Sequence, residues 1–178
     1  MADKRGALIT GANKGIGKEI ARQLGRVGMP VLLSARDEGR GAQAAAELTT
    51  EGIDAHVLHM DVADSASIDN AGRRIQAEFG RLDVLVNDAG IALDNGAASA
   101  TDMDMLRCTY ETTVFGVFAV TKALLPPLKN SEWGRVANLS SGLGSLCHPP
   151  RRRADRRLLR RQRNRAVVTP EGRDSCWT

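Results

Sequence analysis

A glycine-rich segment near the start of the chain, residues 10–17, contains the residue types best suited to hold a phosphate group. Its glycines stand at positions 11, 15 and 17, between an apolar run and an amphipathic one. Glycine permits sharp turns and close backbone approach to a ligand, and the amides and positive dipole end of a following helix stabilise negative charge. The segment predicts a cradle for a dinucleotide pyrophosphate; the alternative is a tight turn that holds no ligand.

Polar residues follow three further apolar runs of the chain. They are Asp61, the segment Asn87 to Gly90, and Ser141. In open α/β sheets, ligands bind at the carboxyl ends of the strands, so these positions suit a shared site. Simpler alternatives remain, because Asp61 could cap a turn before a helix and Ser141 could be an ordinary turn serine.

The elements that must position these residues alternate between strand and helix along the first 146 residues. Apolar positions recur every three or four residues in the helical segments, whereas the fourth strand is almost continuously apolar. Strands are predicted at residues 7–10, 31–35, 55–60, 82–86 and 135–140, and helices at 16–27, 41–48, 65–79 and 102–125. The alternation predicts an α/β fold with a doubly wound, Rossmann-type parallel sheet of five recognisable strands.

Four motifs, in their order and spacing, resemble the short-chain dehydrogenase/reductase family, and more closely its carbonyl-reductase-like members. They are Thr-Gly-Ala-Asn-Lys-Gly-Ile-Gly at 10–17, Asp61-Val62, Asn87-Asp88-Ala89-Gly90, and Asn138-Leu139-Ser140-Ser141. The resemblance covers about residues 5–146. It implies an NADP(H)-dependent oxidoreductase that transfers hydride to or from a small-molecule carbonyl or alcohol substrate.

The resemblance also implies which residues contact the cofactor. The glycine loop would enclose the pyrophosphate and flank the ribose, the third strand end would face the adenine, and the fourth would lie at the switch point of the sheet. These residues are Gly11, Asn13, Lys14, Gly15, Ile16, Gly17, Asp61, Val62, Asn87, Ala89 and Gly90. The family usually has a second asparagine where this chain has Asp88, and a carboxylate in a packed site costs free energy unless it is paired.

Arg36, at the end of the second predicted strand, bears on the choice between the two nicotinamide cofactors. An acidic residue there would bond a free ribose 2′-hydroxyl and repel a phosphate. Arg36 can instead pair with a 2′-phosphate through its planar guanidinium, and Lys14 adds a positive charge on the same side. This favours NADP(H). The alternative makes Arg36 a solvated loop charge and assigns NAD(H) specificity to Asp37.

Ser141 matches the serine that holds the carbonyl oxygen in this family. The resemblance implies that a tyrosine gives or takes the proton and that a lysine four residues beyond it lowers the tyrosine pKa. Neither follows Ser141, since the only tyrosine is Tyr110 and no lysine occurs after Lys129. Thr113 stands where the family has a supporting asparagine, and we expect Tyr110 to pack along its helix. A cofactor-binding protein without its proton donor is therefore the second hypothesis.

The last part of the chain differs from the rest in charge. Residues 1–150 carry 15 basic and 18 acidic side chains, a net charge of −3, whereas residues 151–178 carry 10 arginines and 3 acids, a net charge of +7. We expect residues 1–147 to form a C-terminally incomplete NADP(H)-binding domain whose exposed fifth strand favours self-association. Residues 148–178 are expected to be disordered or frameshift-derived, because a one-nucleotide shift in residues 159–163 can spell tyrosine, two small residues and serine.

Composition excludes several classes of protein. With 178 residues, 42% of them hydrophobic, the chain suits one globular domain. No run approaches the roughly 20 apolar residues that span a bilayer, and no signal-peptide core precedes the first strand, so we expect a cytoplasmic protein with no membrane partner. The three cysteines lack metal-ligand spacing, and no metal site is predicted. A nucleic-acid or acidic partner for the arginine cluster is the least favoured alternative, because aromatic residues for stacking are missing there.

Overall fold

One parallel sheet organises the part of the chain that the computed structural model describes, residues 5–91 and 102–141. Its strand order is β3-β2-β1-β4-β5, and every neighbouring pair is parallel. The strands are β1 (Ala7–Ile9), β2 (Val31–Ala35), β3 (Ala55–His59), β4 (Val84–Asn87) and β5 (Arg135–Asn138). All five predicted strands are present and the predicted doubly wound α/β class is confirmed. The predictions for residues 148–178 lie outside the described residues.

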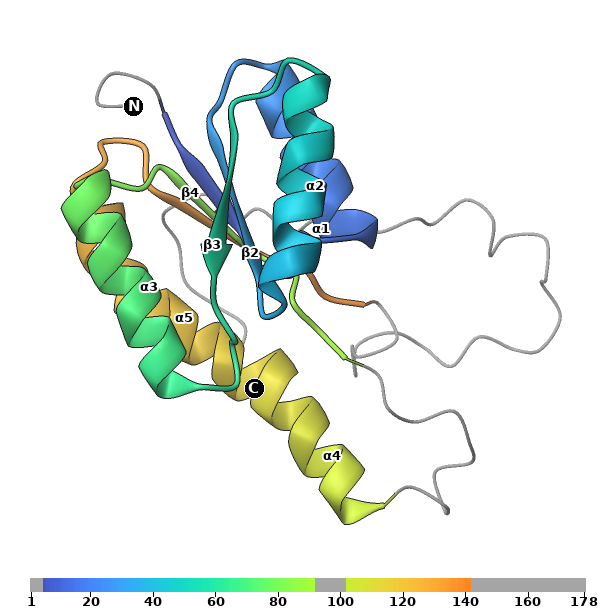
Figure 1. Cartoon of the computed structure of the whole chain (residues 1–178). Helices are drawn as coiled ribbons and strands as arrows, with labels where there is room; N and C mark the ends of the chain where they lie inside the picture. The colour runs from blue at the N-terminus through green and yellow to red at the C-terminus, as the bar shows by residue number, and fades with distance from the viewer. Residues whose placement is uncertain (1–4, 92–101, 142–178) are drawn as a thin grey trace, which may run out of the picture.

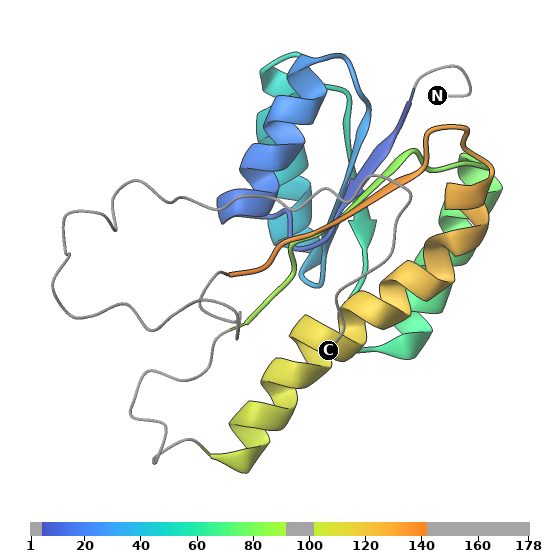
Figure 2. The ribbon, with the colours of Figure 1, turned by 180° about the vertical axis from the view of Figure 1, so that it is seen from behind.

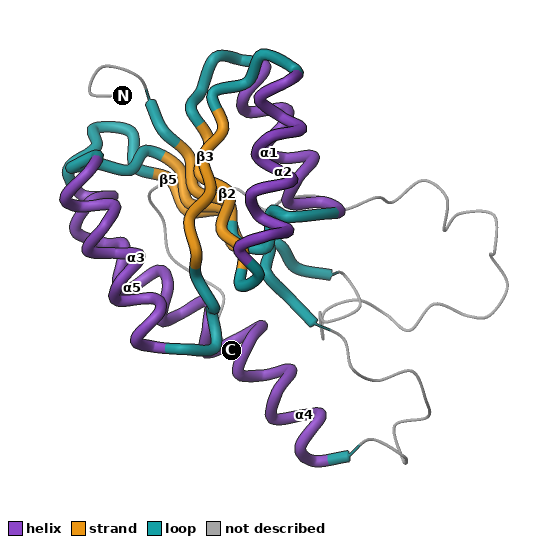
Figure 3. The backbone as a smooth tube through the Cα atoms, in the orientation of Figure 1, coloured by secondary structure: helices purple, strands orange, loops and turns teal. Residues whose placement is uncertain are grey.

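Helices cover both faces of the sheet, as the views in Figures 1 and 3 show. On one face lie α1 (Gly15–Arg26) and α2 (Glu38–Thr50), and on the other lie α3 (Ser65–Glu78) and α5 (Gly116–Lys129). This layering explains the continuous apolarity of the central strands, because each of their faces is covered. Nowhere in residues 5–91 and 102–141 is a helix long and apolar enough to cross a bilayer.

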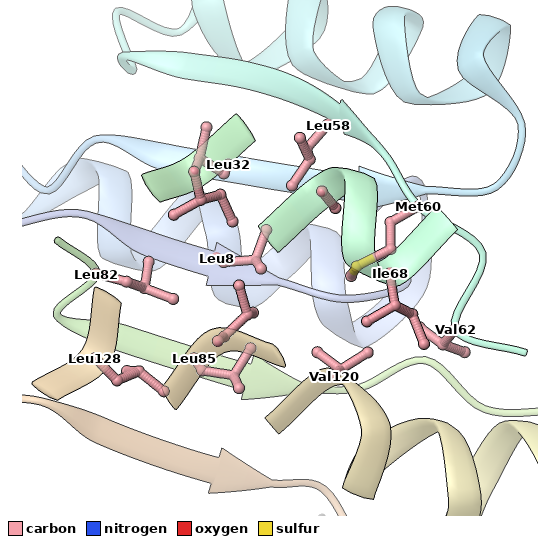
Figure 4. Close-up of a cluster of buried hydrophobic side chains, with 13 residues drawn as sticks. Leu8, Leu32, Leu58, Met60, Val62, Ile68, Leu82, Leu85, Val120 and Leu128 are labelled. Carbon is pink, nitrogen blue, oxygen red and sulfur yellow. The ribbon is translucent and has the colours of Figure 1, made fainter. Parts of the chain in front are cut away.

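The core consists of two hydrophobic clusters, one on each face of the sheet. Along β1 the side chains alternate, with Leu8 in one cluster and Ala7 and Ile9 in the other. Figure 4 shows the first cluster, in which residues of the central strands pack beneath α3 and α5. Because successive strand residues point to opposite faces, this alternation fixes the register of β1 between the two helical layers.

The predicted helix over residues 102–125 is longer than expected and is not uniform. It comprises α4 (Met103–Tyr110), a π-helical turn η2 (Glu111–Phe115), and α5, which continues through Pro126 and Pro127 to Lys129. The predicted end of this helix at residue 125 is therefore wrong. Proline has a helix-compatible φ, and here the lost amides fall in the last turn, where the carbonyls of Pro126 and Pro127 accept from Asn130 and Leu82.

The first part of this long helix lies away from the body of the protein (Figure 2). No residue of α4 is buried, and Tyr110 is 50% exposed. The expectation that Tyr110 packs along the helix against its own chain is therefore wrong within the described residues. Helical periodicity gave the direction of this side chain along α4 but not the presence of an element to cover it.

Other boundaries differ from the predictions by one to three residues, and two of these differences follow from capping and from strand pairing. Helix α2 begins at Glu38 and not at residue 41, since the Asp37 side chain accepts a hydrogen bond from the Arg40 amide and caps the helix. Strand β4 extends to Asn87, which pairs in register with Asn138 of β5. Within the described residues β5 forms one edge of the sheet.

Candidate functional site

A cavity of about 310 Å³ opens at the carboxyl ends of β1 to β4. Its walls come from the ends of these strands and the loops that follow them, from the first turns of α1 and α2, and from one residue of η2. The lining residues are Gly11, Asn13, Lys14, Gly15, Ala35, Arg36, Asp37, Arg40, Met60, Asp61, Val62, Asp88, Ala89, Gly90 and Thr112. Nine of the predicted cofactor-binding residues therefore meet at one site, although they lie as far apart in sequence as Gly11 and Gly90.

The loop after β1 needs glycine for two different reasons. Gly11 and Gly15 have φ values of 67° and 62°, which side chains rarely adopt. At Gly11 an added Cβ would also lie 2.8 Å from the Cα of Ala89, whereas Gly15 has open space around it. The first glycine thus allows the loop to contact the β4 end closely, and the second leaves backbone accessible to a ligand.

Thr10 joins the same two segments by hydrogen bonds. Its hydroxyl oxygen accepts from the backbone amides of Asp88 at 3.0 Å and Ala89 at 2.9 Å, and the residue is 1% exposed. Thr10 was not among the predicted site residues, although it begins the first motif. The family resemblance placed the end of β4 beside the glycine loop, but no sequence signal indicated that the Thr10 hydroxyl would join the two, because 78 residues separate the paired groups.

The amino end of α1 faces Asp88 across the cavity wall. Lys14, the N-cap residue, provides no side-chain hydrogen bond to the first turn. The amide of Gly17 instead donates to the Asp88 carboxyl group, and a Cβ on Gly17 would lie 2.5 Å from Asp88 Oδ2. Burial raises the pKa of Asp88, and this hydrogen bond opposes the rise.

Three cationic residues line the cavity: Lys14, Arg36 and Arg40. The Asp37 carboxylate between the arginines is already engaged, because Oδ1 accepts from the Arg40 amide at 2.9 Å and Oδ2 lies 3.5 Å from Arg40 Nε. The guanidinium of Arg36 has no ion-pair partner in the described residues. Sequence reasoning missed Arg40; the available signal was its position three residues after a capping aspartate, where a first helical turn returns it to the strand end.

Asp61 fits both alternatives considered for it. Its Oδ1 accepts from the Ala63 amide at 3.0 Å and closes a turn before α3, and its own amide donates to Ser67 Oγ at 3.0 Å. Asp61 also lines the cavity beside Val62. These hydrogen bonds therefore hold Asp61 in place at the cavity wall, so its role in the turn is compatible with a role in the site.

Four predicted residues do not line the cavity. Ile16 is 47% exposed at the start of α1, and Gly17 lies behind Asp88 as described above. Asn87 is buried, and its amide nitrogen donates to Asn138 Oδ1 at 2.8 Å and Thr121 Oγ1 at 3.2 Å, so it ties β4 to β5 and α5. Ser141 is exposed, three residues after β5 ends.

The side chains of the described residues include no group of three or more His, Cys, Asp or Glu suited to a metal ion. The groups around the cavity are instead of the kind that bind an anion. It combines backbone amides at a helix start, glycines that allow close approach, and cationic side chains at one wall.

Comparison of the sequence with protein families matches the short chain dehydrogenase model over residues 5–150. Short-chain dehydrogenase/reductase 1 of Saponaria officinalis is 39% identical over 168 residues, which cover 82% of this chain and 56% of that protein. Carbonyl reductase [NADPH] 1 of Rattus norvegicus is 41% identical over 144 residues, covering 80% and 50%. The chain spans about half the length of these curated relatives.

Solved structures show the same likeness. A variant of actinorhodin polyketide ketoreductase with NADPH superposes with a TM-score of 0.74 at 35% identity, covering 79% of this chain and 54% of that one. Menthone neomenthol reductase from Mentha piperita gives a TM-score of 0.73 at 34% identity, covering 81% and 62%. The five-stranded sheet described above is thus found in enzymes of related sequence.

Proposed function

The chain belongs to the short-chain dehydrogenase family, and from this membership we propose that its cavity binds NADP(H) for hydride transfer to or from a small-molecule carbonyl or alcohol. NADPH or NADP is named with relatives on which the proposal draws, among them the rat carbonyl reductase and the polyketide ketoreductase. When bound, the nicotinamide ring would give or take the hydride. The chain's own residues would bind and orient it.

The residues present fit a dinucleotide. The close approach of Gly11 to Ala89 and the open backbone at Gly15 form a cradle that larger residues would fill. The cavity volume of about 310 Å³ falls within the range of small-molecule sites. Asn13 and Lys14 would lie along the ribose and phosphate side, and Asp61 and Val62 along the adenine side, as the family resemblance implies.

The cluster of Lys14, Arg36 and Arg40 is the single observation that carries the choice of NADP(H) over NAD(H). A 2′-phosphate brings two negative charges, which guanidinium groups bind strongly. The competing assignment needed Asp37 to accept from a ribose hydroxyl. Both of its carboxylate oxygens already interact with Arg40, which leaves fewer lone pairs for a ribose hydroxyl and offsets part of the charge of Asp37.

Substitution of Arg36 by aspartate tests the cofactor choice. We expect Arg36→Asp to weaken NADP⁺ binding by about 100-fold, equivalent to about 3 kcal/mol for a lost charge-assisted pair, while NAD⁺ binding changes by less than about threefold. Isothermal titration of both dinucleotides measures this. Arg73→Asp, the same change at an exposed position of α3 outside the cavity, is the matched control. Unchanged NADP⁺ binding by Arg36→Asp would refute the assignment.

A second candidate, cofactor binding without turnover, is favoured by one observation about the proton donor. The only tyrosine of the sequence, Tyr110, lies on the projecting helix α4 and does not line the cavity, and no lysine follows Lys129. A positioned general acid contributes about 10²- to 10⁴-fold to such reactions. Ser141 alone could hold a carbonyl oxygen but could not replace that contribution.

The two candidates separate in a turnover assay. For this chain we expect saturable NADPH binding, with NADPH oxidation on a panel of carbonyl compounds at least about 100-fold slower than that of the rat carbonyl reductase assayed alongside. Absorbance at the reduced nicotinamide band follows the reaction. A rate matching that relative, and lowered by Ser141→Ala, would establish the enzyme and exclude the second candidate.

Two further expectations from the sequence remain proposals. Association of two copies rests on the β5 edge. The division at residue 147 rests on the change of charge and pattern there, and the nucleotide sequence of the gene tests whether residues 148–178 are frameshift-derived. Family-like residues in a shifted frame would support that origin.

A further inference from the structure

Asp88 occupies the position where an anionic ligand would meet the amino end of α1. It follows β4, lines the cavity, and accepts a hydrogen bond from the Gly17 amide. Lys14, the N-cap residue, makes no side-chain hydrogen bond to this helix end. Asp88, from another segment, therefore provides the acceptor that a capping side chain usually provides. A phosphate group would seek the same amides.

Among the residues that the structure describes, no cationic side chain pairs directly with Asp88. None of the ion pairs formed within residues 5–91 and 102–141 includes this carboxylate. Thr10 holds its backbone amide, which fixes the position of the residue without offsetting its charge. Arg40 is paired with Asp37 at the opposite wall. The charged residues that share the cavity with Asp88 are Lys14, Arg36, Asp37, Arg40 and Asp61.

We propose that Asp88 sets the affinity of the cavity for a dinucleotide through the charge of its carboxyl group. The carboxylate repels the ligand's phosphates at the amino end of α1, whereas the protonated acid carries no charge to repel them. This inference rests on the proposed function, because it needs an anionic dinucleotide in the cavity. It adds a residue whose protonation controls that binding.

The direction of the pH effect follows from proton linkage. Burial of the carboxyl group raises the pKa of Asp88 above its ordinary value. A bound polyanion favours the neutral acid still more, so the affinity should rise as the pH falls through this raised pKa. A neutral side chain of the same shape should bind more tightly at high pH and show no such dependence.

The test compares the full-length chain with Asp88→Asn, in which an amide oxygen can still accept from Gly17. Titration calorimetry with NADP⁺ from pH 8 to pH 5 should show about 10-fold tighter binding by Asp88→Asn at pH 8, as expected when one nearby like charge is removed. This advantage should narrow as the pH falls through the raised pKa of Asp88. Asp102→Asn, the same change at the cap of α4 outside the cavity, should follow the unmodified chain.

A second readout needs no ligand. Because the pKa of Asp88 is raised in the folded state, its charged form should lower stability as the pH rises through that pKa. Asp88→Asn should therefore have the higher melting temperature at pH 8, by a few degrees, with the difference closing at lower pH. Asp88→Ser, a second neutral variant, repeats both measurements if the asparagine chain does not fold.

The outcomes separate this inference from the proposed function. Parallel affinity profiles for the unmodified chain and the neutral variants, or weaker binding by them at pH 8, overturn the role of Asp88 and leave NADP(H) binding in place. Failure of all chains to bind NADP⁺ while each melts cooperatively overturns the proposed function, and this inference with it. Comparing variants at each pH cancels the titration of the ligand's own 2′-phosphate, whose pKa is about 6.

Discussion

Replacing Gly11 with alanine is expected to lower the free energy of unfolding by about 3 kcal/mol and to remove most of the dinucleotide binding. Two costs combine at this position. The φ of 67° is strained for a residue with a Cβ, and that Cβ would lie 2.8 Å from the Cα of Ala89. Because the colliding atom is backbone at the end of β4, relief requires the loop and the strand end to separate. That movement would open the wall of the cavity.

Gly28→Ala is the matched control for this prediction. Gly28 has a φ of 84° but nothing within 4 Å of the added Cβ, so it isolates the conformational cost, about 1 to 2 kcal/mol. Urea denaturation of both variants measures the difference, and NADP⁺ titration shows whether binding fails only for Gly11→Ala. Equal destabilisation by the two substitutions would mean that the contact with Ala89 does not constrain the loop.

Leu124→Ala is expected to destabilise the chain by about 3 kcal/mol, within the 2 to 5 typical of buried leucines. Leu124 is 1% exposed on the face of α5 that packs against the sheet, in the cluster that also contains Leu8 and Leu85. Truncation would leave a cavity between α5 and the central strands that neighbouring side chains fill only in part. The same helix carries η2 on its amino-terminal side, so its docking also positions Thr112 at the cavity.

Leu125, the next residue along α5, provides the control for Leu124→Ala. Leu125 is 40% exposed, and we expect Leu125→Ala to cost less than about 1 kcal/mol. Denaturant midpoints for the two single variants test the register of α5 directly. Similar costs for both would place the helix in a different rotation about its axis from the one described.

Local patterns in the sequence were sufficient to predict the glycine loop that follows β1 and lines the cavity. Gly11, Gly15 and the strand-turn-helix around them are contained in 20 consecutive residues, 7–26, and their conformational preferences act within that span. The cap at Asp37 was equally local but went unused, and with it the position of Arg40 was missed. That error came from assigning the helix start by hydrophobic periodicity without weighing the capping residue.

Contacts between distant segments could not be predicted in the same way. Thr10 pairs with Asp88 and Ala89, and Asn87 pairs with Asn138, because parallel strands bring together residues that a crossover separates. The exposure of Tyr110 likewise depends on whether another element covers α4. Helical periodicity identifies one face of a helix, and it does not show whether a partner occupies that face.

The sequence by itself determined the α/β class, the family and the glycine loop after the first strand, because strand and helix periods, glycine spacing and motif order are local features of the chain. Only the tertiary structure decided that Asp37 is held by Arg40, that Asp88 faces the amino end of α1, and that Asn87 links strands beside the cavity. Each of these features is a contact between side chains from different segments. Such contacts depend on the strand order, which places β4 next to β1, and local preferences of the backbone do not specify that order.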